Sequence, residues 1–382
     1  MNKKSPPSLF APIRIRDLEL ANRIVMSPMC QYSCEDGMPT DWHLVHLGSR
    51  AIGGAGLVWA EMTAVSREGR VSPGCAGLYL DEHVAPWRRV TDFVHAQTSA
   101  RIGIQLGHAG RKAATKRMWE GHNVPLDSGA WPLLGPSPDP FSPDHQVPRE
   151  MDRADMDRIV GEYVRAARRA LDAGFDAVEL HAAHGYLPSS FLSPISNLRT
   201  DDYGGQLSNR LRFPLEIVDA LRAALPDEVP LSAKISSADL VDGGNTIEEG
   251  VQIAKALAGH GVDIVSVSAG GITGRVRPPR LAPCGFVPFS HRIRESVDAV
   301  VAVVGNINTP AEAAAVVSEG SADLVVMARA FLRDPYWPLH AAIRLGVDVD
   351  GWPDQYCAVP LQLEELKARL GLDASASPAA AR

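Results

Sequence analysis

The chain has 382 residues, of which 45% are hydrophobic and 22% are charged, a composition typical of a soluble globular protein with a large core. Its formal net charge is −7 and its lysines and arginines form no basic stripe, so we expect no nucleic-acid partner. We find neither a secretory signal nor a segment long enough to cross a membrane, and five scattered cysteines suit a reducing compartment. These features predict a cytoplasmic enzyme.

The strands are predicted from a local pattern that recurs along the chain. An amphipathic helix ends near a glycine, a short polar turn follows, and a run of Val, Ile and Leu comes next. Clear copies lead into residues 177–180, 264–267 and 324–327, and a looser copy leads into residues 57–60. In chain order, the predicted strands are residues 23–27, 57–61, 102–106, 177–180, 231–235, 264–267, 300–304 and 324–327.

Helical patterns separate these strands and are clearest at residues 152–173, 208–225 and 246–259. Eight apolar strands that alternate with helices predict an α/β fold, namely a closed (β/α)8 TIM barrel. An open doubly wound sheet is the alternative, but no G-x-G-x-x-G motif follows the first strand.

We expect one barrel domain that covers residues 1–372. The connection between the third and fourth strands, residues 116–150, is rich in Pro, Gly, Trp and Asp and is too long for a simple turn. It is therefore predicted to be a capping loop over the barrel mouth. Residues 373–382 contain no large apolar side chain and are predicted to form a disordered tail.

The segment after the fourth strand carries the strongest functional signal. His181 ends the strand, and His184 and Tyr186 follow closely, with Gly185 allowing the backbone to bend between them. Two neutral imidazoles can donate N–H groups to a developing oxyanion, and a phenol can deliver a proton. One such residue alone is better interpreted as structural. Three together at the end of a barrel strand predict an active site, because the carboxyl ends of barrel strands meet there.

The other strand ends supply groups that suit a bound heterocycle and a phosphate. Gln105 and Lys234 offer an amide and a cation, which can hold and polarise a ring. Gly305 and Asn306 follow the seventh strand and Arg329 follows the eighth, where barrels often bind phosphate. No pair of Asp or Glu residues suited to a metal occupies these ends, so we predict no metal site.

Four motifs in this chain resemble the old yellow enzyme family. They are RIVMSPMCQY at residues 23–32, QLGHAGRK at 105–112, HAAHGYL at 181–187 and NLRTDDYGG at 197–205. The similarity runs from about residue 9 to about residue 346, with the motifs in family order, and the combination of motifs is highly specific.

The resemblance implies a cofactor and a reaction. It implies a barrel that binds FMN non-covalently, is reduced by NADPH or NADH, and then reduces an activated C=C bond of a small-molecule substrate. The pairing of Cys30 with Tyr32 resembles the thermophilic-like, single-cysteine subgroup of the family. The FMN-binding residues that the resemblance implies are Ser27, Pro28, Met29, Cys30, Met62, Gln105, Lys234, Gly305, Asn306, Ala328 and Arg329.

The resemblance also implies roles for the residues around the substrate. His181 and His184 would hold the substrate carbonyl or the nicotinamide amide and stabilise negative charge as hydride arrives. Tyr186 would donate a proton on the opposite face, and Tyr32 would line the substrate pocket. Cys30 would lie near the reactive edge of the flavin and tune its potential, so we count it with the catalytic residues.

Three positions depart from the family pattern. Lys234 stands where the family usually has Arg near the N1–C2=O region of the flavin, and a Lys offers a point charge without the bidentate fork. Ala328 precedes Arg329 where the family has Gly-Arg, so the phosphate site requires that the backbone there accept a Cβ. Met62 replaces a small residue and would crowd the flavin edge.

Two other functions compete with this interpretation. One is a metal-dependent hydrolase with His181 and His184 as ligands, although the sequence lacks carboxylates to complete the shell. The other is a flavoprotein NAD(P)H oxidase, or a reductase module that acts with a partner hydroxylase.

The residues after the third strand also bear on the substrate. Residues 111–114, 129–132 and 136–138 are similar to the reductase portions of bacterial aryl-CoA hydroxylase/reductases, which implies an aromatic or thioester substrate. A generic capping loop is an equally good interpretation of these residues. For the assembly as a whole, we expect a homo-oligomer.

Overall fold

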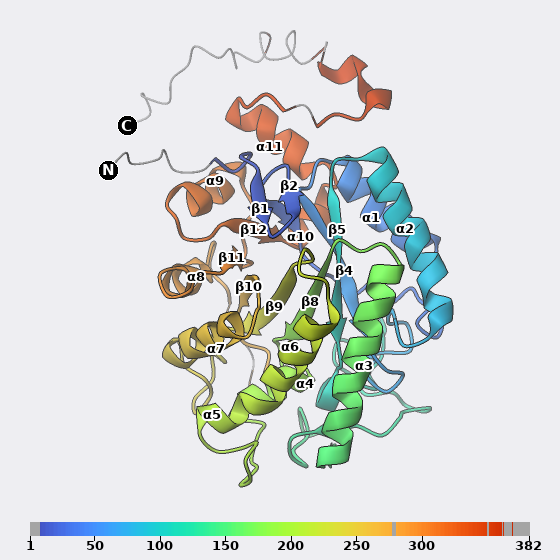
Figure 1. The fold of residues 1–382 in the computed structure, drawn as a ribbon, viewed down its shortest axis with the longest axis vertical. Helices are drawn as coiled ribbons and strands as arrows, with labels where there is room; N and C mark the ends of the chain where they lie inside the picture. Colours follow the sequence, from blue (N-terminus) through green and yellow to red (C-terminus); the bar gives the residue numbers. More distant parts are fainter. Residues whose placement is uncertain (1–7, 277–279, 350, 361, 363–368, 370–382) are drawn as a thin grey trace.

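The computed structural model of the chain describes residues 8–276, 280–349, 351–360, 362 and 369 (Figure 1). The predicted tail at residues 373–382 lies outside the described residues. In Figure 1 the first and last described segments, drawn in blue and in orange to red, lie toward one end of the molecule, and the connection that follows β5 (Arg101–Gly107) lies at the other.

Eight parallel strands form a closed barrel, which confirms the predicted fold class. β3 pairs with β4 on one side and with β12 on the other, so the first and last strands of the barrel close the sheet. Each of the eight predicted apolar runs overlaps one barrel strand. In chain order these strands are β3 (Ile24–Met26), β4 (Leu57–Ala64), β5 (Arg101–Gly107), β8 (Ala177–Ala182), β9 (Leu231–Ser236), β10 (Ile264–Ser268), β11 (Val300–Val303) and β12 (Leu324–Met327).

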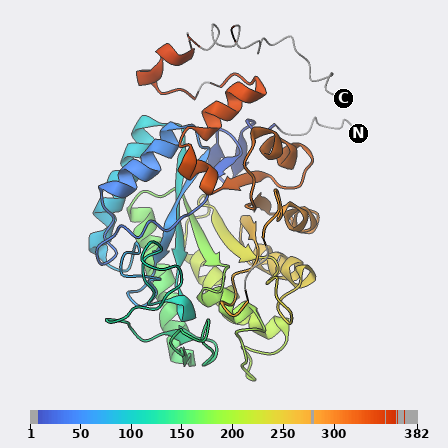
Figure 2. The same cartoon turned by 180° about the vertical axis from the view of Figure 1, so that it is seen from behind.

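Helices surround the barrel and bury the outer faces of its strands, which is why apolar residues dominate these strands (Figures 1 and 2). The longer helices are α1 (Asp41–Ile52), α2 (Val84–Gln97), α3 (Arg153–Asp172), α6 (Arg212–Ala224), α7 (Ile247–Gly259), α8 (Val287–Arg294), α9 (Pro310–Ser318) and α11 (Trp337–Leu345). The short segments are α4 (Leu187–Leu192), α5 (Leu207–Arg210), α10 (Arg329–Arg333), η1 (Asp81–His83), η2 (Gly110–Lys112) and η3 (Asp354–Tyr356). None of the described helices has the length and apolar character that a membrane span requires.

Capping side chains determine where three of the helices begin. Asp152, Thr246 and Thr309 each cap the helix that follows through a side-chain oxygen that accepts a backbone N–H three residues on. The single helix predicted at residues 208–225 is wrong in its continuity, because the chain forms α5 and α6 with a break at Leu211. Pro214 has no N–H to donate to the carbonyl four residues earlier, which explains the break.

A hairpin that the sequence pattern did not reveal closes the amino end of the barrel. β1 (Ile13–Ile15) pairs antiparallel with β2 (Leu18–Leu20). Its side chains Ile15, Leu18 and Leu20 pack in one buried cluster with Leu57 and Trp59 of β4. Strands of three residues are too short to show a reliable alternation, so only the closed barrel explains their burial.

The capping insertion lies after β5, as predicted, and is fastened to the segment that follows β10. It contains only two short strands, β6 (Leu134–Gly135) and β7 (Arg149–Glu150), which pair with each other. The Phe141 carbonyl accepts hydrogen bonds from Gly274 N at 3.0 Å and from Thr273 Oγ1 at 3.2 Å. The insertion therefore bridges two loops at the carboxyl end of the barrel.

A substitution of Gly103 on β5 can be used to test how tightly the inside of the barrel is packed. A Cβ added to Gly103 would collide with the Trp59 ring, which fills the space beside it. We expect Gly103→Ala to lower the free energy of unfolding by about 1–3 kcal/mol, since overpacking a dense core forces neighbours to move. Urea-induced unfolding measures the change.

Gly259→Ala is the matched control, because nothing lies within 4 Å of the Cβ that it adds at the end of α7. Its expected effect is at most a gain of about 1 kcal/mol, from a less flexible unfolded chain. Equal effects of the two substitutions would contradict the packing account.

Candidate active site

Two sets of buried hydrogen bonds involve strands β5, β8 and β9 and the turn after β3. Gln105 of β5 donates through Nε2 to Glu179 Oε1 of β8 at 2.8 Å, and Ser232 Oγ of β9 donates to Glu179 Oε2 at 2.8 Å. Lys234 of β9 donates through Nζ to Ser27 Oγ, which follows β3, at 3.1 Å. Burial raises the pKa of Glu179 and lowers that of Lys234, while each group's charge acts to keep the other ionised. Glu179 thus orients the Gln105 amide and balances the Lys234 charge.

Two residues of these sets keep unused hydrogen-bonding capacity. Among the described residues, Gln105 Oε1 has no donor and two of the three Lys234 ammonium protons have no acceptor. An acceptor on β5 and a cationic donor on β9 are therefore available on the two strands that flank β8. This donor set suits a planar heterocycle that has both N–H and C=O groups on one edge.

The predicted catalytic rings lie together at the end of β8. The His181 ring centre is 4.5 Å from the Tyr186 ring and 5.3 Å from the His184 ring, and both pairs meet edge to face. A left-handed turn brings them together, with φ of 59° at His184 and 78° at Gly185. A Cβ at Gly185 would lie 2.7 Å from the Gly271 carbonyl oxygen, so only glycine fits this close approach.

His181 is a neutral imidazole with a defined donor. Its Nδ1 accepts the Ala183 backbone N–H at 3.2 Å, which leaves the proton of the neutral ring on Nε2. Burial lowers the pKa of His181 well below its usual value, and the neighbouring His184 and Lys234 lower it further. The Nε2–H group is therefore available to donate without a net charge on the ring.

His184 is anchored from three directions. Its backbone N–H donates to Ser236 Oγ at 2.9 Å, its carbonyl accepts from Lys112 Nζ at 2.7 Å, and its ring Nε2 lies 2.8 Å from Ser268 Oγ. Burial lowers the pKa of His184 to about 3, with further effects from Lys234 and Lys112. When the Ser268 hydroxyl donates to Nε2, the proton of the neutral ring resides on Nδ1, which has no partner among the described residues.

Cys30 and Tyr32 face Tyr186 from the loop after β3. All three belong to one cluster with Met62, and Tyr32 adopts a φ of 51° that turns the chain at this point. Burial raises the pKa of Tyr186 well above 10, and Cys30 and Tyr32 add to the shift. Burial also raises the pKa of the Cys30 thiol, with contributions from Cys75 and Glu61. Phenol and thiol therefore both stay protonated at neutral pH.

A β-bulge in β4 positions Met62. The pairing of β4 with β5 shifts register between Ala60 and Met62, so Glu61 is the extra residue. Glu61 accepts a hydrogen bond from Gln31 N at 3.0 Å and lies 3.1 Å from His43 Nε2. Met62 packs against Gly107, where an added Cβ would lie 2.7 Å from Met62 Cγ. The larger side chain at position 62 is thus accommodated by a glycine on the next strand.

The residues predicted to bind phosphate follow β11 and β12. Gly305 lies against Phe286, and a Cβ at position 305 would approach the Phe286 backbone N to 3.0 Å. The Asn306 carbonyl accepts from Cys284 N at 3.3 Å. Ala328 has φ −105°, an ordinary value for an L-residue, so the backbone accepts this Cβ. The exposed Arg329 guanidinium makes no hydrogen bond or ion pair within the described part of the chain.

A cavity of about 860 Å³ opens in front of the His184 and Tyr186 rings. Tyr32, His184 and Tyr186 line one side, Phe141 of the capping insertion lines another, and residues of the segments 269–276 and 280–289 complete the wall. The structure therefore brings Tyr32, His184 and Tyr186 to one cavity. His181, which was also predicted to bind substrate, does not line this cavity, and its ring centre lies 4.5 Å from the Tyr186 ring. Gln105 and Lys234 belong to the two neighbouring sets of buried hydrogen bonds and do not line this cavity.

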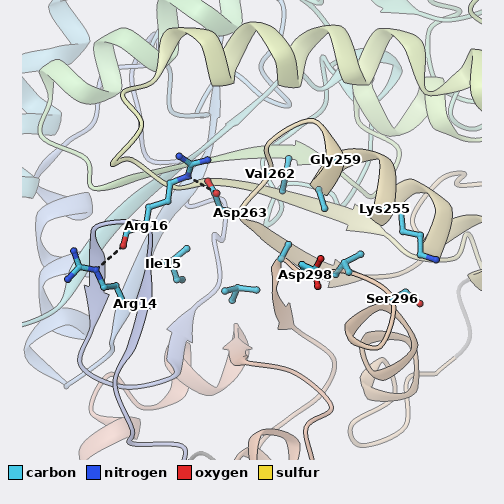
Figure 3. A pocket seen from close by; sticks show the side chains of 13 residues that line it. Arg14, Ile15, Arg16, Lys255, Gly259, Val262, Asp263, Ser296 and Asp298 are labelled. Carbon is cyan, nitrogen blue, oxygen red and sulfur yellow. Dashed lines mark hydrogen bonds and ion pairs between the residues drawn. The ribbon is translucent and has the colours of Figure 1, made fainter.

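A second cavity, of about 510 Å³, lies at the amino end of the barrel beside the β1–β2 hairpin (Figure 3). Its Asp263 pairs with Arg16 at 2.6 Å and accepts the Leu231 N–H, so its charge fastens the hairpin and β9. Within the described ranges, no group of three or more His, Cys, Asp or Glu side chains is placed to hold a metal ion. Neither this cavity nor a cluster of metal ligands among the described residues therefore offers an alternative to the candidate site around His181 and Tyr186.

Two contributors to the site escaped the sequence analysis. Glu179 interrupts the apolar run 177–180. Because carboxylates are rarely buried without a partner, this residue could have been used to predict a cation near the strand. Lys112 belongs to a recognised motif, but nothing in the sequence places its ammonium beside Tyr186 and His184. That contact depends on the path of η2 across the barrel end.

Comparison with known proteins decides the family. The sequence pattern of the NADH:flavin oxidoreductase / NADH oxidase family matches residues 8–346. The chain belongs to this family. It is 42% identical over 343 residues to an NADPH dehydrogenase of Geobacillus sp. (strain WCH70), covering 89% of this chain and 95% of that protein. It is 39% identical over 350 residues to an NADPH dehydrogenase of Listeria monocytogenes serotype 4a (strain HCC23), covering 91% and 98%.

Solved structures agree with this assignment. Morphinone reductase in complex with tetrahydroNAD has a TM-score of 0.74 and 28% identity, and the match covers 90% of this chain and 92% of that one. A 2-naphthoyl-CoA reductase complex has a TM-score of 0.79 and 28% identity, and the match covers 89% of this chain but only 52% of that one. The resemblance to old yellow enzymes is confirmed, and the protein is an NAD(P)H-dependent flavin oxidoreductase with FMN as its cofactor.

The side chains present fit FMN. Lys234 offers unpartnered N–H groups and Gln105 an unpartnered carbonyl, which match the C=O and N–H groups on the pyrimidine edge of a flavin. Arg329 offers an unpartnered guanidinium at the strand ends where a phosphate is expected. We assign Gln105, Lys234 and Arg329 as candidate FMN ligands on these grounds.

The lowered histidine pKa values predict how stability depends on pH. In the unfolded chain a histidine binds a proton below about pH 6.5, whereas folded His184 stays neutral until about pH 3. The unfolded state therefore binds more protons as pH falls, and His184 alone removes about 1–2 kcal/mol of stability between pH 7 and pH 5.

Urea unfolding of wild type and His184→Gln at both pH values tests this. The variant should lose about that much less stability on acidification, while His291→Gln, an exposed histidine of α8, should behave as wild type. Parallel losses in all three proteins would show that His184 is not held neutral.

Proposed function

We propose that the protein is an ene-reductase, which reduces an activated C=C bond in a small molecule that carries a carbonyl group. The observation that supports this most is the assembly of two neutral imidazoles and a protonated phenol at the end of β8, where His184 and Tyr186 line the cavity. Bound FMN would supply the hydride, after reduction by NADPH or NADH. The side chains of this chain would bind the substrate carbonyl and supply the proton.

His181 and His184 bind the carbonyl oxygen of the substrate. The His181 Nε2–H and the His184 Nδ1–H are the donors that the hydrogen bonds to Ala183 and Ser268 leave available. As hydride reaches the β-carbon, negative charge develops on this oxygen, and fixed donors in a buried site stabilise it. The same pair can hold the nicotinamide amide during the preceding reduction, which explains why one site serves two flat ligands.

Tyr186 protonates the α-carbon. Its raised pKa keeps the hydroxyl protonated in the resting site, so a proton is available whenever the substrate binds. A strongly held proton is transferred only as the carbanionic α-carbon develops, which couples proton transfer to hydride transfer. Tyr32 and Phe141 would cover the substrate, and Cys30 would contact the flavin edge as a neutral thiol.

The similar proteins support a reductive role. Two of the solved structures are named morphinone reductase and 2-naphthoyl-CoA reductase. We further propose that residues 1–372 form one FMN-binding domain, that the chain forms a homo-oligomer, and that it is cytoplasmic. Size-exclusion chromatography with light scattering and cell fractionation test the last two statements.

Both half-reactions can be followed in one anaerobic experiment. The FMN-loaded protein is titrated with NADPH and then with 2-cyclohexenone while its visible spectrum is recorded. We expect the flavin absorbance to fall with NADPH and to return with the enone. Recovery only after oxygen is admitted would instead favour an oxidase, or a reductase module that serves a partner.

Tyr186→Phe tests the proton donor. We expect the rate of flavin reoxidation by 2-cyclohexenone to fall about 10- to 100-fold, because general-acid catalysis is lost while water partly replaces it. Flavin reduction by NADPH should change less than about twofold, since it needs no proton from Tyr186.

Tyr336→Phe serves as the matched control, because the Tyr336 hydroxyl lies beside Tyr356 and away from the cavity. Stopped-flow absorbance measures both steps. An equal loss in the two half-reactions of Tyr186→Phe would assign the residue a purely structural role.

A further inference from the structure

Lys112 places a positive charge in the wall of the substrate cavity. Its Nζ donates to the His184 carbonyl at 2.7 Å and lies 5.1 Å from the centre of the Tyr186 ring. It also lies 4.6 Å from the centre of the Phe141 ring, so two aromatic faces flank the ammonium. Lys112 therefore contacts the proton donor, the carbonyl-binding turn and the capping insertion at once.

This cation lacks the counter-charge that its neighbours have. Arg111, next in the chain, pairs with Asp139 at 2.5 Å, and buried Lys234 is compensated by Glu179. Lys112 forms no ion pair with any carboxylate that the structure describes. A partly buried ammonium without an anion beside it is unfavourable, and burial together with Arg111 lowers the pKa of Lys112 to about 8.

The rest of the cavity does not supply an anion either. Asp239 is the one carboxylate among the described lining residues. Its Oδ2 already accepts from Ser193 Oγ and from Asn245 N, each at 2.7 Å. A second cation, Arg280, lines the cavity and has no partner within the described ranges. The cavity is thus apolar and aromatic with an excess of positive charge.

We propose that Lys112 pairs with a carboxylate of the substrate, so that the preferred substrates are unsaturated carbonyl compounds that also carry an anionic group. This inference rests on the proposed ene-reductase function. The carboxylate replaces the missing counter-ion and forms a charge-assisted hydrogen bond with one of the ammonium protons that the His184 carbonyl does not use. A neutral substrate of the same shape leaves the ammonium unpaired.

A matched pair of substrates tests the proposal. (E)-4-Oxopent-2-enoate and its methyl ester carry the same enone and differ in charge. Because the ester also activates the double bond more than the carboxylate does, the two substrates are compared as a ratio, and only changes of this ratio between enzyme variants are interpreted. The measured quantity is the ratio of kcat/KM for the acid to kcat/KM for the ester. We expect Lys112→Met to lower this ratio about 10- to 100-fold, the range of one charge-assisted hydrogen bond, and Lys112→Arg to preserve most of it.

Lys116→Met is the matched control, because it removes an equal charge from the capping insertion where Lys116 pairs with Asp127 outside the cavity. Its ratio should equal that of wild type. A ratio that Lys112→Met leaves within about twofold of wild type would overturn the proposal, because a purely structural role affects both substrates alike.

The phosphates of NADPH are the other source of an anion. If Lys112 bound them, Lys112→Met would raise the Kd for NADPH in the reductive half-reaction and leave the acid-to-ester ratio unchanged, which would also overturn the proposal. We expect the Kd for NADPH to change less than the ratio does.

A binding measurement separates this proposal from the proposed function. Calorimetric titration of the oxidised FMN-loaded protein with benzoate and with benzamide needs no turnover. We expect wild type to prefer benzoate and Lys112→Met to lose that preference. If wild type reduced neither unsaturated substrate, the proposed reaction would fail while this preference still reported on Lys112, and an equal affinity for both ligands in wild type would overturn the role of Lys112.

Discussion

The electrostatic interaction between the buried charges of Glu179 and Lys234 is the constraint on which the site depends. Hydrogen bonds join Glu179 to Gln105 of β5 and to Ser232 of β9, and Lys234 to Ser27 in the turn after β3. Neither charge would be tolerated alone in the barrel, since an isolated buried ion is strongly destabilising. The unused N–H donors of Lys234 and the unused acceptor of Gln105 remain available at the carboxyl end of the barrel. The residues that are candidates to bind the flavin ring thus belong to the same group of residues that neutralises the buried charges of the barrel.

Burial also determines the protonation states of the catalytic rings. The same exclusion of water that keeps His181 and His184 neutral keeps Tyr186 protonated. Neutral imidazoles donate hydrogen bonds without repelling Lys112 or Lys234, and the phenol retains a proton to give. Two residue types with different solution pKa values are in this way brought to the protonation states that the proposed reduction of a carbonyl-activated double bond requires.

Most of the fold followed from local pattern, whereas the polar network did not. The barrel strands are rich in apolar residues and four of them follow glycine turns, so each was visible as an apolar run in the sequence. The strand-end position of His181 and Tyr186 followed from the barrel rule. The hydrogen bond from Gln105 to Glu179 joins residues on two strands 74 positions apart, and its register is set only when the barrel closes. The contact of Lys112 with Tyr186 likewise depends on loop paths that no periodicity encodes.

The account rests on two neutral imidazoles that donate to a substrate carbonyl, and infrared spectroscopy of that carbonyl tests it most directly. 2-Cyclohexenone labelled with carbon-13 at the carbonyl is bound to the oxidised FMN-loaded protein, and its stretching frequency is compared with the frequencies in water and in an apolar solvent. The account predicts a frequency below that in water for wild type and a return toward the apolar value in His181→Ala/His184→Ala. An apolar-like frequency in wild type, or an unchanged frequency in the double variant, would contradict it.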